Sequence, residues 1–399
     1  MRRVVIFSAE YPVLSETFVW REVQSLKENG IDVKVATLRT ASKAAQGIAS
    51  ANWVLFEKGI AKVLFNSTKA LITNPVRACK TLWFAINNAW NCDETVKNKL
   101  KILFQGYSAL GLAKAIEAFE PEWLHCHFAH APATYTMFVA RFLNLKWSFT
   151  GHANDLFQRK TLLKEKLENA EKVACISEWH KTFYLDIVPS VERKLKVIRC
   201  GVALNENCTG TLNSNFSIIS VGRLIEKKGF HILLEACQKL GNIKEKIVVN
   251  IIGDGPEKYK LEQLAKSLPP NIQVVFHGSK PHHEILKLLL QADLFVMPCI
   301  DDKNGDRDGI PVSMMEAMAA GVPVLSGDLP AIRELIEDGV TGWIRPATAN
   351  EIETTLLQII HDKPTTKKIG KSAKCWVSQE FSTSVNTKRL INMISGDIQ

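Results

Sequence analysis

Residues 216–240 read FSIISVGRLIEKKGFHILLEACQKL. The first six residues form an apolar run, which predicts a buried strand. A loop bounded by Gly222 and Gly229 follows, and residues 230–240 then have the apolar spacing of an amphipathic helix. A strand that is apolar on both faces and leads into a helix is typical of a parallel sheet covered by helices.

The same alternation continues along the chain in both directions. We expect the other strands at residues 3–8, 33–37, 123–127, 146–150, 172–176, 196–198, 247–253, 272–277, 294–298 and 322–326. The stretch 200–215 interrupts the pattern and is rich in Gly and Asn, as a linker is. The sequence therefore predicts an α/β protein with two Rossmann-like domains whose parallel sheets face one another. Ligands are expected in the inter-domain cleft, at the carboxyl ends of the strands.

The composition excludes several other classes. The chain has 399 residues, of which 46% are hydrophobic and 23% charged, so it is too apolar for a disordered protein. It contains no uncharged apolar run of about 18 residues, so no transmembrane helix is expected. The nine cysteines are scattered singly, which fits a reducing, cytoplasmic location better than a disulfide-bonded secreted domain.

The net charge of +9 is confined to one half of the chain. Residues 1–200 carry 28 basic and 18 acidic side chains, giving +10, and the remainder carries −1. Residues 40–105 are basic, helical in composition and rich in aromatic side chains. The segment is read as an extra helical subdomain on the first sheet or as a patch on an anionic membrane surface. No nucleic-acid-binding motif accompanies the charge, so nucleic acid is not an expected partner.

Two segments of the second half have the character of anion sites. Arg223 and Lys228 lie on the loop after the strand at 216–221, beside a predicted helix N-terminus. Farther on, Asp308 precedes a helix predicted to begin near Val312, whose first amides also suit a phosphate. Glu316 lies one turn inside that helix. The loop Gly-Asp-Gly-Pro at 253–256 is a weaker signal of the same kind.

Metal sites are not expected. His125 and His127 point to one face of a predicted strand, and Cys126 points to the opposite face, into the core. The two histidines are therefore read as lining of the cleft. The acidic residues at 301, 302, 306 and 308 do not have the spacing of an EF-hand.

Taken together, the motifs resemble those of the family 4 glycosyltransferases, which have the GT-B fold. The resemblance covers nearly the whole chain and is greatest to the branch of the colanic-acid and exopolysaccharide-biosynthesis enzymes. It is carried by YPVLSETFVWREVQSLKENG, HCHFA, FTGHANDLF, CISEWHK, VIRCGV, GRLIEKKG, IIGDGPE, HGSKPHHEI, FVMPC and DGIPVSMMEAMAAGVPV. Two features depart from the family pattern. Asp308 stands where most members have Glu, and the first loop has Ser15, Glu16 and Thr17 in place of a Gly-Gly pair.

The resemblance implies a retaining transfer of a sugar from a nucleoside-diphosphate sugar to an acceptor hydroxyl, without a cofactor. The acceptor expected for this branch is a lipid-linked saccharide for surface polysaccharide, so the enzyme would be cytoplasmic or peripheral on the membrane. The last segment, 376–399, would cross back to the first domain (1–200) from the second (201–375). The implied catalytic residues are His152, Arg223, Lys228 and Asp308. The implied donor-binding residues are Gly222, Arg223, Lys228, Gly253, Gly255, Ser279, Asp308, Gly309, Ile310, Val312 and Glu316, and those on the acceptor side are Ser15, Glu16, Thr17 and His127.

Two other functions share this fold. A nucleotide-sugar epimerase would lack the acidic pair of Asp308 and Glu316 in combination with the GRxxxxKG loop. A non-catalytic nucleotide-sugar-binding subunit is disfavoured because Arg223, Lys228 and Glu316 are all present.

Overall fold

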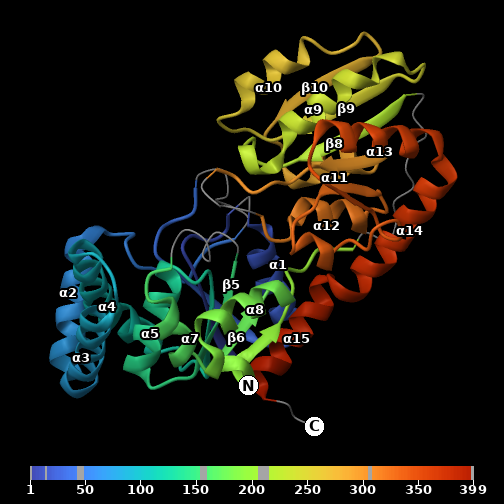
Figure 1. Ribbon diagram of the computed structural model, residues 1–399. Coiled ribbons are helices and arrows are strands. Elements are labelled where there is room, and N and C mark those ends of the chain that lie inside the picture. The colour runs from blue at the N-terminus through green and yellow to red at the C-terminus, as the bar shows by residue number, and fades with distance from the viewer. Residues whose placement is uncertain are drawn as a thin grey trace. The chain divides into compact units, whose positions relative to one another are not determined.

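The computed structural model describes residues 2–13, 16–42, 49–152, 160–204, 215–303 and 308–396. The chain forms two compact units (Figure 1). The first comprises residues 1–199 and 386–399, and the second comprises residues 200–385. Most of the predicted linker at 200–215 lies outside the described residues, as does Ser15. Among the described residues, no helix is both long and apolar enough to cross a membrane.

The first unit contains a parallel sheet in the order β3-β2-β1-β4-β5-β6-β7. The crossover next to β1 gives the strand order of a Rossmann fold. Its strands are β1 (Arg3–Ser8), β2 (Asp32–Thr37), β3 (Trp53–Val54), β4 (Trp123–His127), β5 (Trp147–Gly151), β6 (Lys172–Cys175) and β7 (Leu195–Val197). The two-residue strand β3 was not predicted, because it is too short to show a periodic pattern.

Side chains of β1 alternate between two apolar cores, one on each face of this sheet. Val5 and Phe7 contribute to one core, and Val4 and Ile6 contribute to the other. This alternation explains why the strand is apolar throughout, as expected for a sheet buried on both sides. The helices of the unit are α1 (Thr17–Glu28), α2 (Gly59–Thr73), α3 (Pro75–Asn91), α4 (Val96–Glu117), α5 (Ala131–Leu143), α7 (Leu163–Asn169), α8 (Glu178–Ile187) and α15 (Thr383–Ser395), with a 3₁₀ helix η1 (Pro189–Lys194).

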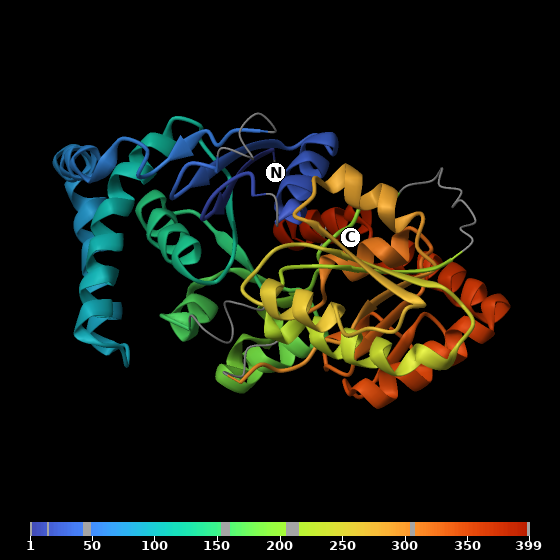
Figure 2. The same cartoon turned by 90° about the horizontal axis from the view of Figure 1, so that it is seen from above.

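Helices α2, α3 and α4 stand together at one side of the first unit (Figure 2). Small residues allow the close approach: a Cβ at Gly106 of α4 would overlap the side chain of Ala85 of α3. Ala70, Ala78 and Ala85 join the core on one face of the sheet. The basic segment is thus a helical subdomain attached to the first sheet, and it extends beyond residue 105 to the end of α4.

The second unit contains a parallel sheet in the order β10-β9-β8-β11-β12-β13. Its strands are β8 (Phe216–Val221), β9 (Ile247–Ile252), β10 (Ile272–Gly278), β11 (Leu294–Met297), β12 (Val324–Gly327) and β13 (Trp343–Arg345). The helices are α9 (Phe230–Lys239), α10 (Lys258–Ala265), α11 (His282–Leu289), α12 (Val312–Ala319), α13 (Ala349–His361) and α14 (Lys363–Glu380), with 3₁₀ turns η2 (Glu226–Lys228), η3 (Leu240–Asn242) and η4 (Ile332–Glu334). The short strand β13 was also missed by the sequence pattern.

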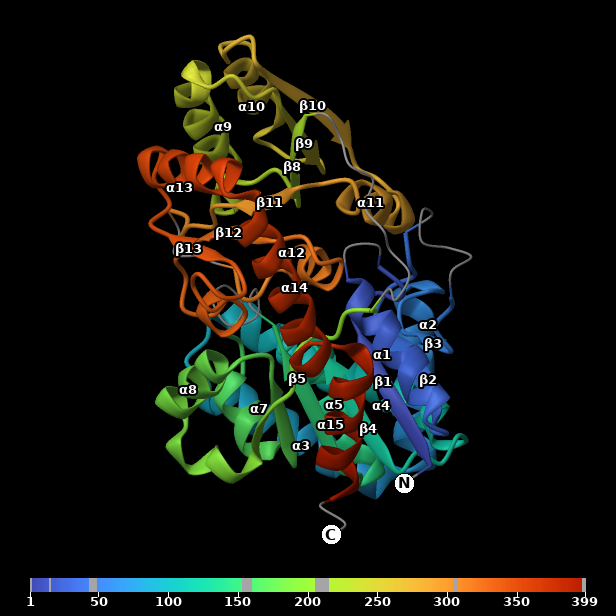
Figure 3. The same cartoon turned by 90° about the vertical axis from the view of Figure 1, so that its right-hand side faces the viewer.

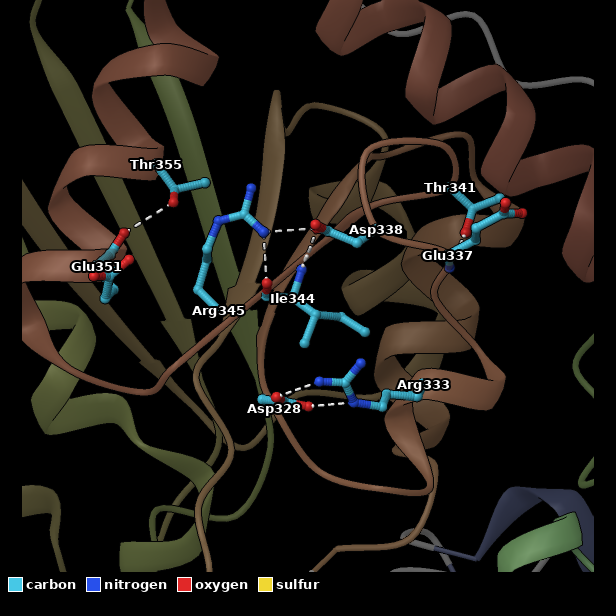
Figure 4. Close-up of polar contacts among 9 residues, drawn as sticks. All are labelled: Asp328, Arg333, Glu337, Asp338, Thr341, Ile344, Arg345, Glu351 and Thr355. Carbon is cyan, nitrogen blue, oxygen red and sulfur yellow. Dashed lines mark hydrogen bonds and ion pairs between the residues drawn. The ribbon is translucent and has the colours of Figure 1, made fainter.

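Polar contacts hold the last turns of this unit in place (Figure 4). Arg333 of η4 donates two hydrogen bonds to Asp328, which follows β12, at 2.7 and 2.6 Å. Asp338 accepts from the amide of Ile344 in β13 at 3.0 Å and from the guanidinium of Arg345 at 2.7 Å. These contacts explain how a strand of three residues keeps its position at the sheet edge.

The predicted end of the second domain, at residue 375, lies inside helix α14. Two successive helices, α14 and α15, are separated by a break at Phe381 and Ser382 (Figure 3). Leu390, Met393 and Ile394 of α15 belong to the same core as Val4 and Ile6 of β1. The chain therefore returns to the first unit at residue 386, inside the segment 376–399 that was expected to cross back.

Candidate functional site

The loop between β8 and α9 is held close to the neighbouring strand ends by its glycines. Gly222 donates to the carbonyl of Ile252 at 3.0 Å, and Leu224 donates to the carbonyl of Asp254, also at 3.0 Å. Gly229 has a φ of +68°, and a Cβ there would overlap the carbonyl oxygen of Pro298. Only glycine satisfies both conditions without strain. The loop that carries Arg223 and Lys228 is thus fixed against the ends of β9 and β11.

Lys228 and Asp308 meet at this loop. The Lys228 Nζ lies 2.9 Å from Oδ2 of Asp308, and the Lys227 Nζ lies 3.5 Å from Oδ1. The side chains of Lys228 and Asp308 are only 14% and 13% exposed. Burial alone raises the pKa of Asp308, but attraction to Lys228 and then Lys227 outweighs it, so that its pKa is lowered. Asp308 is therefore an anion held between two cations.

Cys299 supports the same carboxylate. Its Sγ donates to Oδ2 of Asp308 at 3.6 Å, and burial raises the pKa of the thiol. Sequence reasoning did not select Cys299 or Lys227. Arg223, by contrast, is an exposed side chain on the same loop.

Glu316 lies on α12, which begins directly after Pro311. Ser313 of the first turn donates to the carbonyl of Val221, which ties the start of the helix to the end of β8 at 2.8 Å. Glu316 is buried, and its Oε1 lies 2.9 Å from Nε2 of His282 at the start of α11. The structure thus brings Lys228, Asp308 and the N-terminal turn of α12 to the carboxyl end of one sheet. His282 was not predicted, although its motif HGSKPHHEI was noted.

The other predicted donor residues lie on neighbouring loops of the second unit. Gly253 has a φ of +138°, and a Cβ there would overlap the carbonyl oxygen of Gly222. Gly255 is similarly tight against Leu224. Ser279 is exposed just after β10, whereas Gly309, Ile310 and Val312 are half-buried around the start of α12.

The first unit gathers histidines at the carboxyl ends of β4 and β5. His127 ends β4, and His152 directly follows β5. The centroids of their rings lie 5.6 Å apart, and the Nδ1 of His127 lies 3.4 Å from the Nε2 of His152. The rings of Phe18 and Phe128 pack against His152 at 4.7 and 4.6 Å. Burial and the neighbouring histidines, His127 first among them, hold the pKa of His152 well below its usual value.

Glu22 of α1 completes this cluster and was missed by the sequence analysis. Its Oε1 lies 2.9 Å from the Nε2 of His127. Burial by itself raises the pKa of Glu22, but the charge and hydrogen bond of His127 lower it by more. His127 therefore has both ring nitrogens within hydrogen-bonding distance of partners in the first unit. Glu16 and Thr17 lie where α1 begins, and Thr17 is its first residue.

His125 has separate partners. Trp123 donates to the Oγ of Ser148 at 2.8 Å, and Ser148 in turn can donate to the Nδ1 of His125 at 2.8 Å. The Nε2 of His125 then donates to Thr150 at 3.0 Å. Burial lowers the pKa of His125 to about 3.

Glu22, His125 and His127 have ligand-type atoms within 4.8 Å of one another. Hydrogen bonds account for these atoms, so the cluster carries no argument for a metal. Cys126, on the opposite face of the strand, lies in the apolar core, as predicted.

Comparisons with known proteins fit this architecture. Residues 210–376 match the family model described as glycosyl transferases group 1. The chain is 27% identical to a putative colanic acid biosynthesis glycosyltransferase, WcaL, of Salmonella typhimurium, over 98% of this chain and 99% of the relative. It is 26% identical to the amylovoran biosynthesis glycosyltransferase AmsK of Erwinia amylovora, with the same coverage of both chains.

Solved structures share the fold. A crystal structure of Anabaena HepE in complex with UDP and glucose superimposes with a TM-score of 0.69 at 16% identity, covering 99% of this chain and 100% of that one. TarM of S. aureus superimposes with a TM-score of 0.71 at 13% identity, covering 99% of this chain and 100% of that one. The chain is therefore a glycosyltransferase with the GT-B fold, and it resembles the colanic-acid and exopolysaccharide-biosynthesis branch of family 4.

Proposed function

We propose that this glycosyltransferase moves a sugar from a nucleoside-diphosphate sugar to an acceptor hydroxyl with retention of configuration, in exopolysaccharide biosynthesis. The observation that carries the proposal is the meeting of Lys228, Asp308 and the first turn of α12 at the carboxyl end of the second sheet. This arrangement offers positive charge to a diphosphate and a carboxylate to a sugar. The relatives named for colanic acid and amylovoran biosynthesis support the pathway.

Lys228 is proposed to bind the diphosphate. A lysine ammonium has three donors, so it can bond to Asp308 and to a phosphate oxygen together. Arg223 supplies a second cation on the same loop. The amides at the start of α12 add a partial positive charge, because they have no acceptor within the helix. Charge that develops on the leaving diphosphate would be stabilised by these groups.

Glu316 is proposed to accept hydrogen bonds from the ribose hydroxyls. His282 bonds to its Oε1 and so holds the carboxylate in one orientation. Asp308 would bind hydroxyls of the donor sugar, and His152 would approach the same sugar from the first unit. The leaving phosphate oxygen would take the proton of the acceptor, so the proposed reaction needs no cofactor or metal. The complex of a structural neighbour with UDP and glucose supports a nucleotide-sugar donor.

Transfer assays with UDP- and GDP-sugars and a lipid-linked saccharide test this proposal. Lys228→Ala should lower the turnover number by about 10²- to 10³-fold, the range for losing one preorganised charge-stabilising group. Lys260→Ala is the matched control, because Lys260 is exposed in the same unit and its ion pair is with the neighbouring Glu257. Full activity in Lys228→Ala, or an inverted product, would contradict the proposal.

The acceptor is proposed to be presented at an anionic membrane surface. Exposed apolar side chains concentrate on α2, α3 and the start of α4, among them Phe65, Trp83 at 71% and Trp90 at 81% exposure. On α3, Val76, Trp83 and Trp90 are spaced seven residues apart and so follow one stripe of the helix. Lysines and Arg77 are interspersed on these helices, and a surface that mixes lysines with tryptophans suits a membrane interface better than a protein one.

Co-sedimentation with vesicles tests the membrane contact. Vesicles rich in phosphatidylglycerol should bind the protein at low salt and release much of it at high salt, because salt screens the basic side chains. Pure phosphatidylcholine vesicles should bind it weakly. The double variant Trp83→Ser/Trp90→Ser should lose most binding without unfolding, since both side chains are exposed. An absence of binding at low salt would refute this part. Glu16, Thr17 and His127 remain proposed acceptor contacts, as does Ser15, which is not among the described residues.

A further inference from the structure

One lysine of the first unit has its charge buried beside the loop that follows β4. Lys166 of α7 is fully buried. Its ammonium donates to the carbonyl oxygens of Ala129 at 2.7 Å, His130 at 3.2 Å and Thr161 at 2.7 Å. A buried charge costs free energy unless it is bonded, and charge-assisted bonds to backbone oxygens offset that cost. The proposed reaction gives this lysine no role.

The carbonyls that Lys166 binds lie next to strained backbone. Phe128 and Leu162 have φ values of +74° and +53°, which residues with a Cβ rarely adopt. Phe128 directly precedes Ala129, and Leu162 directly follows Thr161. Among the described residues, only two other non-glycine residues have a positive φ. Such strain persists only where the surroundings hold the chain in place, and the bonds from Lys166 do so at both turns.

The strained Phe128 packs against His152. The centroid of its ring lies 4.6 Å from that of the imidazole, and its amide donates to the carbonyl of Thr150 at 3.0 Å. On its other side, the ring stacks on His130 at 5.5 Å. The backbone of residues 128–130 therefore decides where the Phe128 ring lies. The ring in turn limits the rotation of the His152 imidazole, because close packing leaves a side chain little room to turn.

We propose that Lys166 is a positioning residue of this transferase: its ammonium holds the loop after β4 so that the Phe128 ring stays against His152 and orients the imidazole. The consequence for catalysis rests on the proposed contact of His152 with the donor sugar. Lys166→Met fills a similar volume but removes the N–H groups, so the carbonyls of Ala129 and His130 lose a donor. The strained loop then relaxes, and the Phe128 ring leaves its place.

Ring-proton chemical shifts of ¹³C-labelled histidine show whether Lys166 controls this packing, because the ring current of an aromatic side chain shifts the protons of its neighbour. His152→Asn assigns the signal of His152. Phe128→Leu removes the adjacent ring and should move that signal, and Lys166→Met should move it in the same direction. Lys164→Met, an exposed change on the same helix, should leave it in place. An unmoved signal in Lys166→Met would overturn the inference.

Denaturant unfolding supplies a second readout of the strained loop. Glycine adopts a φ of +74° without strain. The midpoint lost through Lys166→Met should therefore be smaller in a Phe128→Gly background than in a Phe128→Leu background. The comparison also serves if Lys166→Met alone folds poorly, since Phe128→Gly should then restore more folded protein than Phe128→Leu. Equal losses in the two backgrounds would show that Lys166 does not hold the loop.

Donor kinetics test the consequence for catalysis. Lys166→Met should lower kcat/KM for the nucleotide sugar by about 10- to 100-fold, because a displacement of about 1 Å can cost 10²-fold. UDP should still raise the Tm of this variant, since the proposed nucleotide site lies in the second unit. A loss of the same size on adding Lys166→Met to His152→Ala would show that the lysine does not act through His152. Parental kinetics in Lys166→Met with a moved His152 signal would contradict the sugar contact of His152 alone, which separates this inference from the proposed function.

Discussion

Replacing Lys228 by Met removes one charge from a nearly buried ion pair and keeps the length of the side chain. At an effective dielectric constant of about 20, Coulomb attraction to Asp308 is about 6 kcal/mol at 2.9 Å for Lys228 and about 5 kcal/mol at 3.5 Å for Lys227. Roughly half of the attraction at Asp308 is therefore lost. Desolvation and side-chain entropy offset most of that gross figure, and Lys227 remains in place.

The net effect should lie between that of an exposed pair, about 0–1 kcal/mol, and that of a fully buried pair losing one partner, about 3–5 kcal/mol. We expect Lys228→Met to lower the free energy of unfolding of the second unit by about 2 kcal/mol. The pKa of Asp308 should rise toward or above its ordinary value, because its main stabilising charge is gone.

A double-mutant cycle measures the coupling energy between Lys228 and Asp308. It compares denaturant unfolding of the parent, Lys228→Met, Asp308→Asn and the double variant. Lys260→Met is the matched control and should change stability by less than about 1 kcal/mol, because its pair with Glu257 is exposed. A coupling energy near zero between Lys228 and Asp308 would refute the electrostatic account of the site. In parallel, UDP should raise the Tm of the parent but not of Lys228→Met.

Three further outcomes are expected. Glu316→Gln should raise KM for the donor about tenfold and change kcat less, because it weakens hydrogen bonds made before and during transfer; a kcat loss alone would contradict the ribose contact. Gly229→Ala should lower stability by about 1–3 kcal/mol in calorimetry, because of its positive φ and the overlap with Pro298, whereas Gly339→Ala, at φ +73° with open space, should cost less. Stability should fall as pH is lowered from 6.5 toward 3, by up to about 1.4 kcal/mol per pH unit for each of His125 and His180. The unfolded imidazoles bind protons that the folded ones, with pKa lowered to about 3 by burial, do not. Unchanged stability over that range would show that these rings are accessible to protons in the folded state.

The sheets were largely predictable because their strands are apolar runs bounded by turn residues. The run at 216–221 matches β8 residue for residue, whereas β3 and β13 were missed. Those strands are two and three residues long, and backbone pairing with a longer neighbour defines them. Periodicity cannot report pairing of that kind.

The residues of the candidate site likewise divide into those that the sequence predicted and those that it did not. Lys228, Asp308 and Glu316 belong to local motifs, so their spacing was visible. Glu22 and His282 were not predicted as site residues. Each bonds to a partner far away in the sequence, Glu22 to His127 and His282 to Glu316, and the sequence alone does not show these contacts. A lone acid on an amphipathic helix looks like any solvated residue until the fold brings a histidine to it.

The return of α15 to the first unit has a consequence for how the protein is made. Leu390, Met393 and Ile394 complete the core that begins with Val4 and Ile6 of β1. During translation, this face of the N-terminal sheet is therefore covered only in part, by Val19, Val23 and Leu26 of α1, until nearly the whole chain is synthesised. The second unit, made of the continuous stretch 200–385, has no such delay. The second unit can therefore complete its fold before the first unit does, although its synthesis starts later.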